Sequence, residues 1–165
     1  MEQGISSQVI YKKETVTKEN SARLRKQAME FANANSKGTH SDEIKRRLIE
    51  AWGEWVPDYE GWIKWSDSLY TPDSIIYAIG EKPQRFADYQ GSMKHQRDAF
   101  SMEMGPIMQI AVDGDTAALI YYMYLTPRNE PEKTRRLIVT EYNTFEEKDG
   151  KLMVTRLDLY TGVAQ

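Results

Sequence analysis

Apolar residues gather in four runs in the second half of the chain, and these runs predict an antiparallel sheet. They are rich in β-branched and aromatic residues, which favour strands, and they cover residues 107–112, 117–125, 137–145 and 152–160. Asp113-Gly114 separates the first pair and Asp149-Gly150 the last pair. An Asp-Gly step supplies the positive φ angles of a tight hairpin, so we expect two hairpins joined into a meander.

The run 117–125 has no polar face. Both sets of alternate positions along the strand are apolar or aromatic. One side carries Leu119, Tyr121, Met123 and Leu125, and the other carries Ala118, Ile120, Tyr122 and Tyr124. An antiparallel sheet with one face in water normally alternates apolar and polar positions. We therefore expect helices to cover one face and a second copy of the chain to cover the other, as a homodimer.

The first half of the chain predicts helices. Residues 1–16 are expected to form an arm, and Thr17 can cap a helix that ends before Gly38. Ser41 begins a second helix whose apolar stripe ends in Trp52 and Trp55, and Pro57 breaks it. Asp58 then opens a third helix.

A short strand is expected at 74–79, followed by a loop and a helix from about Ser92 to Met102. Gly105-Pro106 is expected to end that helix. The order of helices, strand, helix and meander indicates an α+β fold with the helices gathered on one side of the sheet. We expect one compact domain, with an N-terminal arm and helix at 1–40 and the main unit at 41–165.

The stretch LYTPDSIIY at 69–77 resembles the entry into the first strand of nuclear transport factor 2-like (NTF2-like) proteins. Gly91 before a helix that closes with Phe100, and the two Asp-Gly hairpins, are similar to the rest of that pattern. Within the superfamily the chain is most similar to the SnoaL-like polyketide cyclases and dehydratases. The resemblance implies a strongly curved sheet forming a cone, helices closing its mouth, an apolar cavity and dimerisation through the outer sheet face.

The composition and charge of the chain limit which partners and surroundings we expect for it. The chain has no cysteine, 22 basic and 25 acidic residues and a net charge of −3, with both signs mixed along its 165 residues. Basic clusters at 45–47 and 133–136 adjoin acidic residues, so we interpret them as solvated surface and expect no nucleic-acid partner. No membrane span or secretion signal is recognisable, and we expect a soluble cytoplasmic protein.

Nucleotide-binding, phosphate-binding and nucleophile-elbow motifs are absent from the sequence. The two histidines, His40 and His95, are far apart in the chain and have no neighbouring carboxylates at ligand spacing. We therefore expect neither a metal nor a cofactor. Any catalysis would be acid–base chemistry by a carboxylate, tyrosine or histidine in a pocket.

Three residues are candidates for that chemistry. Asp158 lies in an apolar strand at the same parity as Val154 and Arg156, and cyclase and dehydratase relatives often place a carboxylate deep in the cone. The alternative for Asp158 is an ion pair with Arg156 at a strand end or dimer interface. His95 could shuttle protons with Asp158 if its helix turned that face inward, although an exposed helix histidine is the ordinary alternative.

Tyr142 is the second candidate because it falls where the resembling ketosteroid isomerases carry an oxyanion-donating acid. Their general base would align near Ala78, which cannot do that work. A tyrosine that only packs in the strand is the alternative. We further expect a substrate pocket lined by Trp52, Trp55, Trp62, Trp65, Tyr77 and Arg156, where the alternative for the tryptophans is a core seam.

Two functions remain open at this point. The first is a cofactor-independent cyclase, isomerase or dehydratase that acts on a small, largely apolar carbonyl compound. The second is an NTF2-like module that binds a small ligand or dimerises without chemistry. In a purely assembling protein, Tyr122 and Tyr124 would form the dimer contact and no ligand would bind.

Overall fold

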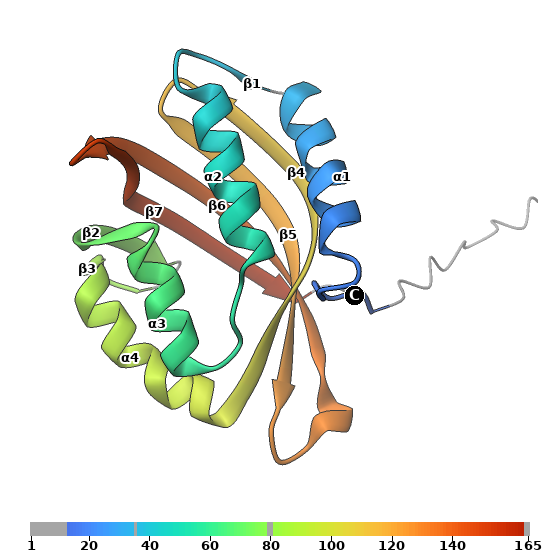
Figure 1. Cartoon of the computed structure of the whole chain (residues 1–165). Helices are drawn as coiled ribbons and strands as arrows, with labels where there is room; N and C mark the ends of the chain where they lie inside the picture. Colours follow the sequence, from blue (N-terminus) through green and yellow to red (C-terminus); the bar gives the residue numbers. More distant parts are fainter. Residues whose placement is uncertain (1–12, 35, 79–80, 164–165) are drawn as a thin grey trace, which may run out of the picture.

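Four helices pack on a seven-stranded sheet in the computed structural model, which describes residues 13–34, 36–78 and 81–163. Figure 1 shows the sheet curling around helices that lie on its concave side. The elements are α1 (Ser21–Ala34), β1 (Ser36–Lys37), α2 (Ser41–Gly53), α3 (Tyr59–Asp67), β2 (Tyr70–Ala78), β3 (Gln84–Arg85), α4 (Phe86–Ala99), β4 (Phe100–Asp113), β5 (Thr116–Pro127), a 3-10 turn η1 (Pro131–Lys133), β6 (Arg135–Lys148) and β7 (Lys151–Val163).

The strand order is β1-β4-β5-β6-β7-β2-β3. Strands β4 to β7 form the predicted antiparallel meander, while β2 pairs with β7 and β1 pairs with β4 in parallel. The sheet is curled but does not close into a barrel. The α+β class and the curved sheet covered by helices are therefore confirmed.

Both hairpins form where Asp-Gly steps predicted them. Asp149 and Gly150 have φ values of 51° and 74°, so both loop residues of the β6–β7 hairpin lie in the left-handed region. The β4–β5 hairpin differs by one residue, because Asp113 pairs with Thr116 and leaves Gly114 and Asp115 as the loop. Only Gly114 has a positive φ there, of 63°.

Helix α4 is placed differently from the prediction of a helix at 92–102. It begins at Phe86, and Gly91 lies inside it. Phe86, Met93 and Arg97 form its buried face at helical spacing, so tertiary packing stabilises a first turn that the local sequence did not indicate. The chain enters β4 at Phe100, and Gly105-Pro106 marks an irregularity in that strand instead of a helix end.

The first helix packs onto the same core as the rest of the chain. Leu24, Ala28 and Ala32 are buried, and α1 lies against α2 and β4, as Figure 1 shows. Thr17 and Asn20 exchange backbone-to-side-chain hydrogen bonds just before α1, which supports the predicted cap. Of the predicted arm, residues 1–12 lie outside the described part of the chain.

A β-bulge in β7 decides which side chains point into the curled sheet. Phe145 of β6 pairs with Val154 of β7, and Thr144 pairs with Arg156, so Thr155 is an extra residue. An extra residue reverses the alternation of the strand beyond it. Val154 is therefore buried on the inner face, while Arg156 two positions later lies on the outer face.

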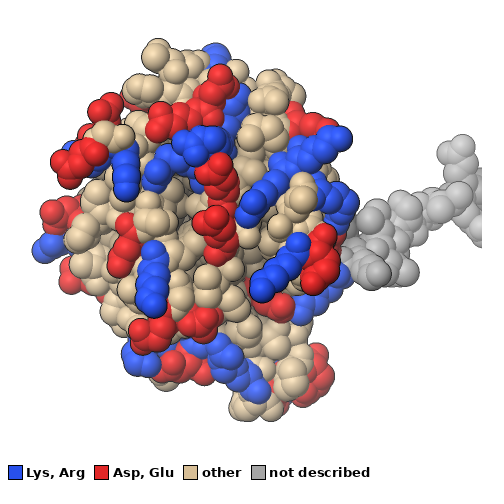
Figure 2. All heavy atoms as spheres, viewed as in Figure 1, with Lys and Arg blue, Asp and Glu red and all other residues tan. Residues whose placement is uncertain are grey.

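Charges of both signs are interspersed on the face of the molecule in Figure 2. Several form exposed pairs, such as Arg46 with Glu50 and Lys94 with Asp98. A mixed surface of this kind lacks the clustered positive charge of a nucleic-acid site. No helix within the described residues is long and apolar enough to cross a membrane.

Two glycines provide a test of this backbone. Gly91 lies on an exposed turn of α4 with no atom within 4 Å of an added Cβ, so Gly91→Ala should stabilise the protein by about 0.5 to 1 kcal/mol. Gly150 has equal space but φ of 74°, so Gly150→Ala should destabilise it by about 1 to 2 kcal/mol. Urea unfolding measures the change in the free energy of unfolding for each of the two variants. Gly162→Ala, in an open strand position without a positive φ, is the control, and a loss of stability in Gly91→Ala would contradict the extent of α4.

Candidate functional site

An aromatic cavity of about 290 Å³ lies between helices α3 and α4 and the concave face of the sheet. Its size is at the lower end of the range for small-molecule sites. The lining side chains come from nearly every element that surrounds the cone: Trp55, Trp62, Trp65, Tyr70, Ala78, Glu81, Phe86, Tyr89, Ser92, Met93, Gln96, Arg97, Met102, Tyr121, Met123, Leu125, Leu137, Val139, Glu141, Leu157, Leu159 and Thr161.

Tryptophans form one wall of this cavity and are fixed by hydrogen bonds. Trp55 Nε1 donates to the carbonyl of Met102 at 2.8 Å, and Trp65 Nε1 donates to the carbonyl of Ala51 at 2.6 Å. The two rings meet edge to face with centroids 4.8 Å apart. Each indole thus has its polar group satisfied by the backbone and presents its apolar surface, which gives a rigid wall suited to a flat apolar ligand.

Glu141 places a carboxylate on the apolar inner face of β6. Tyr121 Oη donates to Glu141 Oε1 at 2.6 Å, and Asn143 Nδ2 donates to Oε2 at 3.3 Å. Burial raises the pKa of Glu141, while the hydrogen bonds from Tyr121 and Asn143 lower it, and the net direction is upward from the usual 4.5. The Glu141 carboxyl group therefore loses its proton at a higher pH than an exposed glutamate does.

Two further tyrosines bring hydroxyl groups to the same cavity. Tyr70 stacks on Phe86 with ring centroids 4.3 Å apart, and Tyr89 packs against the same ring. Neither hydroxyl hydrogen-bonds to another residue in the described part of the chain. Burial raises the pKa of Tyr89 to about 12 and that of Tyr70 well above its usual value, with Glu141 adding to both, so each hydroxyl stays protonated and can donate.

Arg97 brings a positive charge to the cavity wall from α4. Its guanidinium lies over the rings of Trp55 and Trp62, with its central carbon 4.8 Å and 4.3 Å from the two centroids. Burial lowers the pKa of Arg97 to about 10, and the group remains cationic at neutral pH. The cavity thus combines apolar walls with the carboxyl group of Glu141, the exposed carboxyl group of Glu81, one guanidinium and neutral hydroxyl donors.

This set of groups suits proton transfer next to a polarised oxygen. Glu141 can accept or return a proton, and a tyrosine hydroxyl can donate to an oxygen that gains negative charge. Among the described residues no cluster of three or more histidine, aspartate or glutamate side chains has the arrangement of a metal site.

The structure divides the predicted pocket residues between the cavity and other places. Trp55, Trp62 and Trp65 line the cavity. Trp52 is buried on α2 but does not line it, which corresponds to the core-seam alternative. Tyr77 and Arg156 lie on the outer sheet face, where the guanidinium sits 4.3 Å from the Tyr77 ring centroid.

Asp158 lies on the outer face as well, which corrects the expectation that it points into the cone. Arg156 Nε and Nη2 donate to its two carboxylate oxygens at 2.8 and 2.9 Å. This is the ion-pair alternative, and the bulge at Thr155 is its physical cause, because it moves Asp158 off the face of Val154. The inward positions of β7 are Leu157, Leu159 and Thr161.

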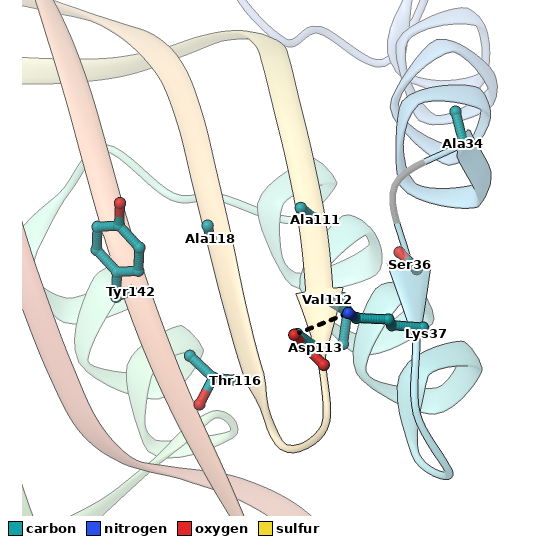
Figure 3. Close-up of a pocket in the computed structure, with 9 residues that line it drawn as sticks. All are labelled: Ala34, Ser36, Lys37, Ala111, Val112, Asp113, Thr116, Ala118 and Tyr142. Carbon is teal, nitrogen blue, oxygen red and sulfur yellow. Dashed lines mark ion pairs between the residues drawn. The ribbon is translucent and has the colours of Figure 1, made fainter.

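Tyr142 and His95 do not reach the cavity either. Tyr142 is 46% exposed and borders a shallow outer groove of about 480 Å³, where Figure 3 shows it beside Ala118 of β5. His95 is exposed on α4. The structure therefore does not bring Asp158, Tyr142 and His95 together as a cavity site.

The outer groove is larger than the cavity, but few of its side chains are suited to binding or catalysis. Small side chains form much of its floor, and its charged pair, Lys37 with Asp113 at 3.3 Å in Figure 3, is exposed. An exposed ion pair is screened by water and contributes little. We therefore assign the candidate functional site to the inner cavity, which is less open than the outer groove.

The sequence pattern did not point us to Glu141, Arg97 or Tyr121, although the sequence of β6 contained a signal for Glu141. The inward positions of β6 include Leu137, Val139 and Phe145, and Glu141 falls at the same parity, together with the buried Asn143. A charged residue among mainly apolar inward positions marks a candidate functional position. Ala78, the residue aligned with the isomerase base, does line the cavity, but it provides no acid or base.

No protein-family model matches the sequence, and no curated protein matches it. Solved structures do match in fold. An NTF2-like protein of unknown function from Pseudomonas putida KT2440 is 16% identical with a TM-score of 0.52, over 75% of this chain and 89% of that one. A protein described as a SnoaL-like polyketide cyclase from Jannaschia Sp. CCS1 is 15% identical with a TM-score of 0.53, over 73% and 83%.

An LEH-like epoxide hydrolase from M. tuberculosis is 17% identical with a TM-score of 0.52, over 70% of this chain and 76% of that one. At such identities the likeness is evidence about the fold and not about the reaction. The chain has an NTF2-like fold, as its sequence predicted.

Proposed function

We propose that the chain is a cofactor-independent enzyme of the cyclase, isomerase or dehydratase type. It acts on a small, largely apolar carbonyl compound in the aromatic cavity, with Glu141 as the proton-transfer group. The observation that carries this proposal is the Glu141 carboxylate, which lies in an apolar cavity and is held there by Tyr121 at 2.6 Å.

The proposed step begins with proton removal. Glu141 takes a proton from the carbon next to the substrate carbonyl, and the electron pair moves to the carbonyl oxygen to form an enolate. Tyr70 or Tyr89 donates a hydrogen bond to that oxygen, since neither hydroxyl has another partner in the described residues. The protonated Glu141 then returns its proton to a second carbon in an isomerisation, or to a leaving hydroxyl in a dehydration.

Tyr121 and Asn143 act on the carboxylate and not on the substrate. Their two hydrogen bonds fix the orientation of Glu141 and offset part of the cost of burying its charge. Removing either partner should leave a worse-oriented base. The aromatic walls exclude water, which strengthens the interaction between the hydroxyl donors and a developing enolate oxygen.

Binding without chemistry is the alternative. It would need the same walls but would have no use for a carboxyl group among them, because burying an ionisable group costs free energy. The names of two fold relatives, a cyclase and an epoxide hydrolase, add support for catalysis in this kind of cavity. A purely assembling role is supported less, since Tyr124 is already covered by Lys13 and Glu14 of its own chain.

Glu141→Gln should abolish catalysis while leaving the fold intact, because glutamine keeps the shape and an acceptor for Tyr121 but cannot take a proton. Deuterium exchange at the α-carbons of 2-indanone and 2-tetralone, followed by proton NMR, measures the step directly. We expect exchange to be slower by at least about 100-fold in the variant. In the wild type, kcat/KM should fall as the pH is lowered through the pKa of Glu141, which lies above 4.5.

Two matched variants make this experiment decisive. Glu147→Gln removes an exposed carboxylate from the same strand and should leave exchange unchanged. Asp158→Asn removes the outer-face carboxylate and should also leave it unchanged. Full exchange activity in Glu141→Gln, or its loss in Asp158→Asn, would contradict the proposed role of Glu141.

We also propose that the outer sheet face forms a homodimer. Large apolar side chains are exposed there, namely Ile138, Tyr142 and Tyr160 at 39%, 46% and 41%. Tyr142 and Tyr160 meet edge to face at 6.4 Å, so they form one patch on neighbouring strands. Such a patch on a sheet face is typical of a protein interface.

Ile138→Glu combined with Tyr160→Glu should convert the dimer into a monomer, because two buried charges would face their own copies across the two-fold axis. Sedimentation velocity measures the change in mass. Lys18→Glu, an exposed substitution in the turn before α1 and outside the sheet, is the control. A wild-type protein that sediments as a monomer at high concentration would refute the dimer.

A further inference from the structure

Arg97 is a buried cation that the proposed proton transfer does not use. Its side chain is only 2% exposed, yet it lines the cavity. No carboxylate in the described part of the chain forms an ion pair with it. Asp58 acts on it electrostatically, but that carboxylate caps α3 by accepting from the backbone N–H of Gly61.

The donors of Arg97 exceed the acceptors around it. Nη1 donates to the backbone carbonyls of Val56 and Pro57 at 3.4 and 3.2 Å. Nε is buried without a partner, and Nη2 donates to no acceptor within the described residues. One edge of the guanidinium, formed by Nε and Nη2, is therefore unsatisfied by the protein.

A structural role accounts for only part of this arrangement. The two long hydrogen bonds from Nη1 tie α4 to the connection between α2 and α3, which a neutral donor could also do. They do not explain why a full positive charge is held without a counter-ion. Buried charges in proteins are normally paired, so an unpaired one beside a cavity indicates that its partner is a ligand.

We propose that Arg97 recognises a carboxylate on the ligand, so that the cavity takes small apolar monocarboxylates. The claim refines the substrate class of the proposed function and rests on the same cavity. The free edge of a guanidinium matches the two oxygens of a carboxylate. The rings of Trp55 and Trp62, whose centroids lie 4.8 Å and 4.3 Å from its central carbon, hold the guanidinium in place before the ligand arrives.

The position of Arg97 relative to Glu141 fits such a ligand. Tyr89 lines the same cavity as Arg97 and Glu141, and both charges act on it, since Glu141 raises its pKa and Arg97 lowers it. A ligand with its carboxylate at Arg97 would extend its apolar body past Tyr89 towards Glu141. A dianion such as a phosphate ester would leave one charge unpaired in this cavity, which favours a monoanion.

Tryptophan fluorescence tests the inference, because two of the four tryptophans flank Arg97. The wild-type protein is titrated with octanoate and with octanamide, which has the same shape and no charge. We expect octanoate to bind at least about tenfold more tightly. Equal affinities, or tighter binding of octanamide, would overturn the inference without any variant.

Substitutions assign the preference to this residue. Arg97→Met should remove the preference for octanoate, Arg97→Lys should retain part of it, and Arg46→Met, at an exposed arginine paired with Glu50, should retain all of it. A preference that survives intact in Arg97→Met would refute the assignment. If Arg97→Met does not fold, the Nε–H resonance of Arg97 in the ¹⁵N-arginine-labelled wild type decides: it must shift with octanoate and not with octanamide.

Glu141→Gln separates this inference from the proposed function. Octanoate binding should persist or tighten in that variant, because a neighbouring negative charge is gone, while α-proton exchange is lost. Octanoate binding that persists together with full exchange would refute the catalytic role of Glu141 and leave the role of Arg97 standing. Loss of octanoate binding in a folded Glu141→Gln protein would contradict the role of Arg97.

Discussion

The hydrogen bond from Tyr121 to Glu141 is the interaction on which the candidate site depends. A carboxylate facing an aromatic cavity is costly, and its 2.6 Å bond from Tyr121 together with the weaker one from Asn143 offsets part of that cost. Both donors come from the inner face of the curled sheet, on β5 and β6. The curl of the sheet thus brings the acid and its supporting donor together beneath α3 and α4.

The opposite face of the same strands forms the outer surface of the sheet and does not line the cavity. Tyr142 and Asp158 are direct neighbours of cavity residues in sequence, but they point away from the cavity. There they contribute to an exposed aromatic surface with Tyr160 and to the ion pair with Arg156. Alternation along two strands therefore separates the proposed chemistry from the proposed assembly, and each can be altered without touching the other.

Much of the fold could be predicted from the sequence because its signals are local. The hairpin at Asp149-Gly150 needs positive φ angles that these two residues supply, and Asp58 caps α3 through its own side chain. The start of α4 at Phe86 could not be predicted in this way. Its first turn is stabilised by contacts of Phe86 with Tyr70 and Trp62, which are distant in sequence.

The candidate site was predicted only in part, for a related reason. Three of the four tryptophans line the cavity, since they form a cluster of large aromatic residues where the helices close the cone. The carboxylate of the cavity was expected on β7 and lies on β6, because a strand pattern with two apolar faces does not reveal a bulge. Thr155 breaks the alternation of β7, whereas β6 runs unbroken and carries Glu141 inward.

The two charges within the cavity, apart from the exposed Glu81 at its lining, give it two different ends. Arg97 contacts two indole rings at one wall, and Glu141 is fixed by hydrogen bonds on the sheet. Neither is paired with the other or with any oppositely charged side chain in the described residues. A cavity with this polarity selects both the charge of its ligand and the end at which chemistry takes place.

A carbon-13 NMR titration of the Glu141 carboxyl group tests the central claim most directly, with its resonance assigned by its absence in Glu141→Gln. The account predicts a midpoint above the usual 4.5, because burial in the cavity disfavours the charged form more than Tyr121 and Asn143 favour it. A midpoint at or below 4.5 would contradict it, since the carboxylate would then be a solvated or firmly paired anion and not a group ready to exchange protons.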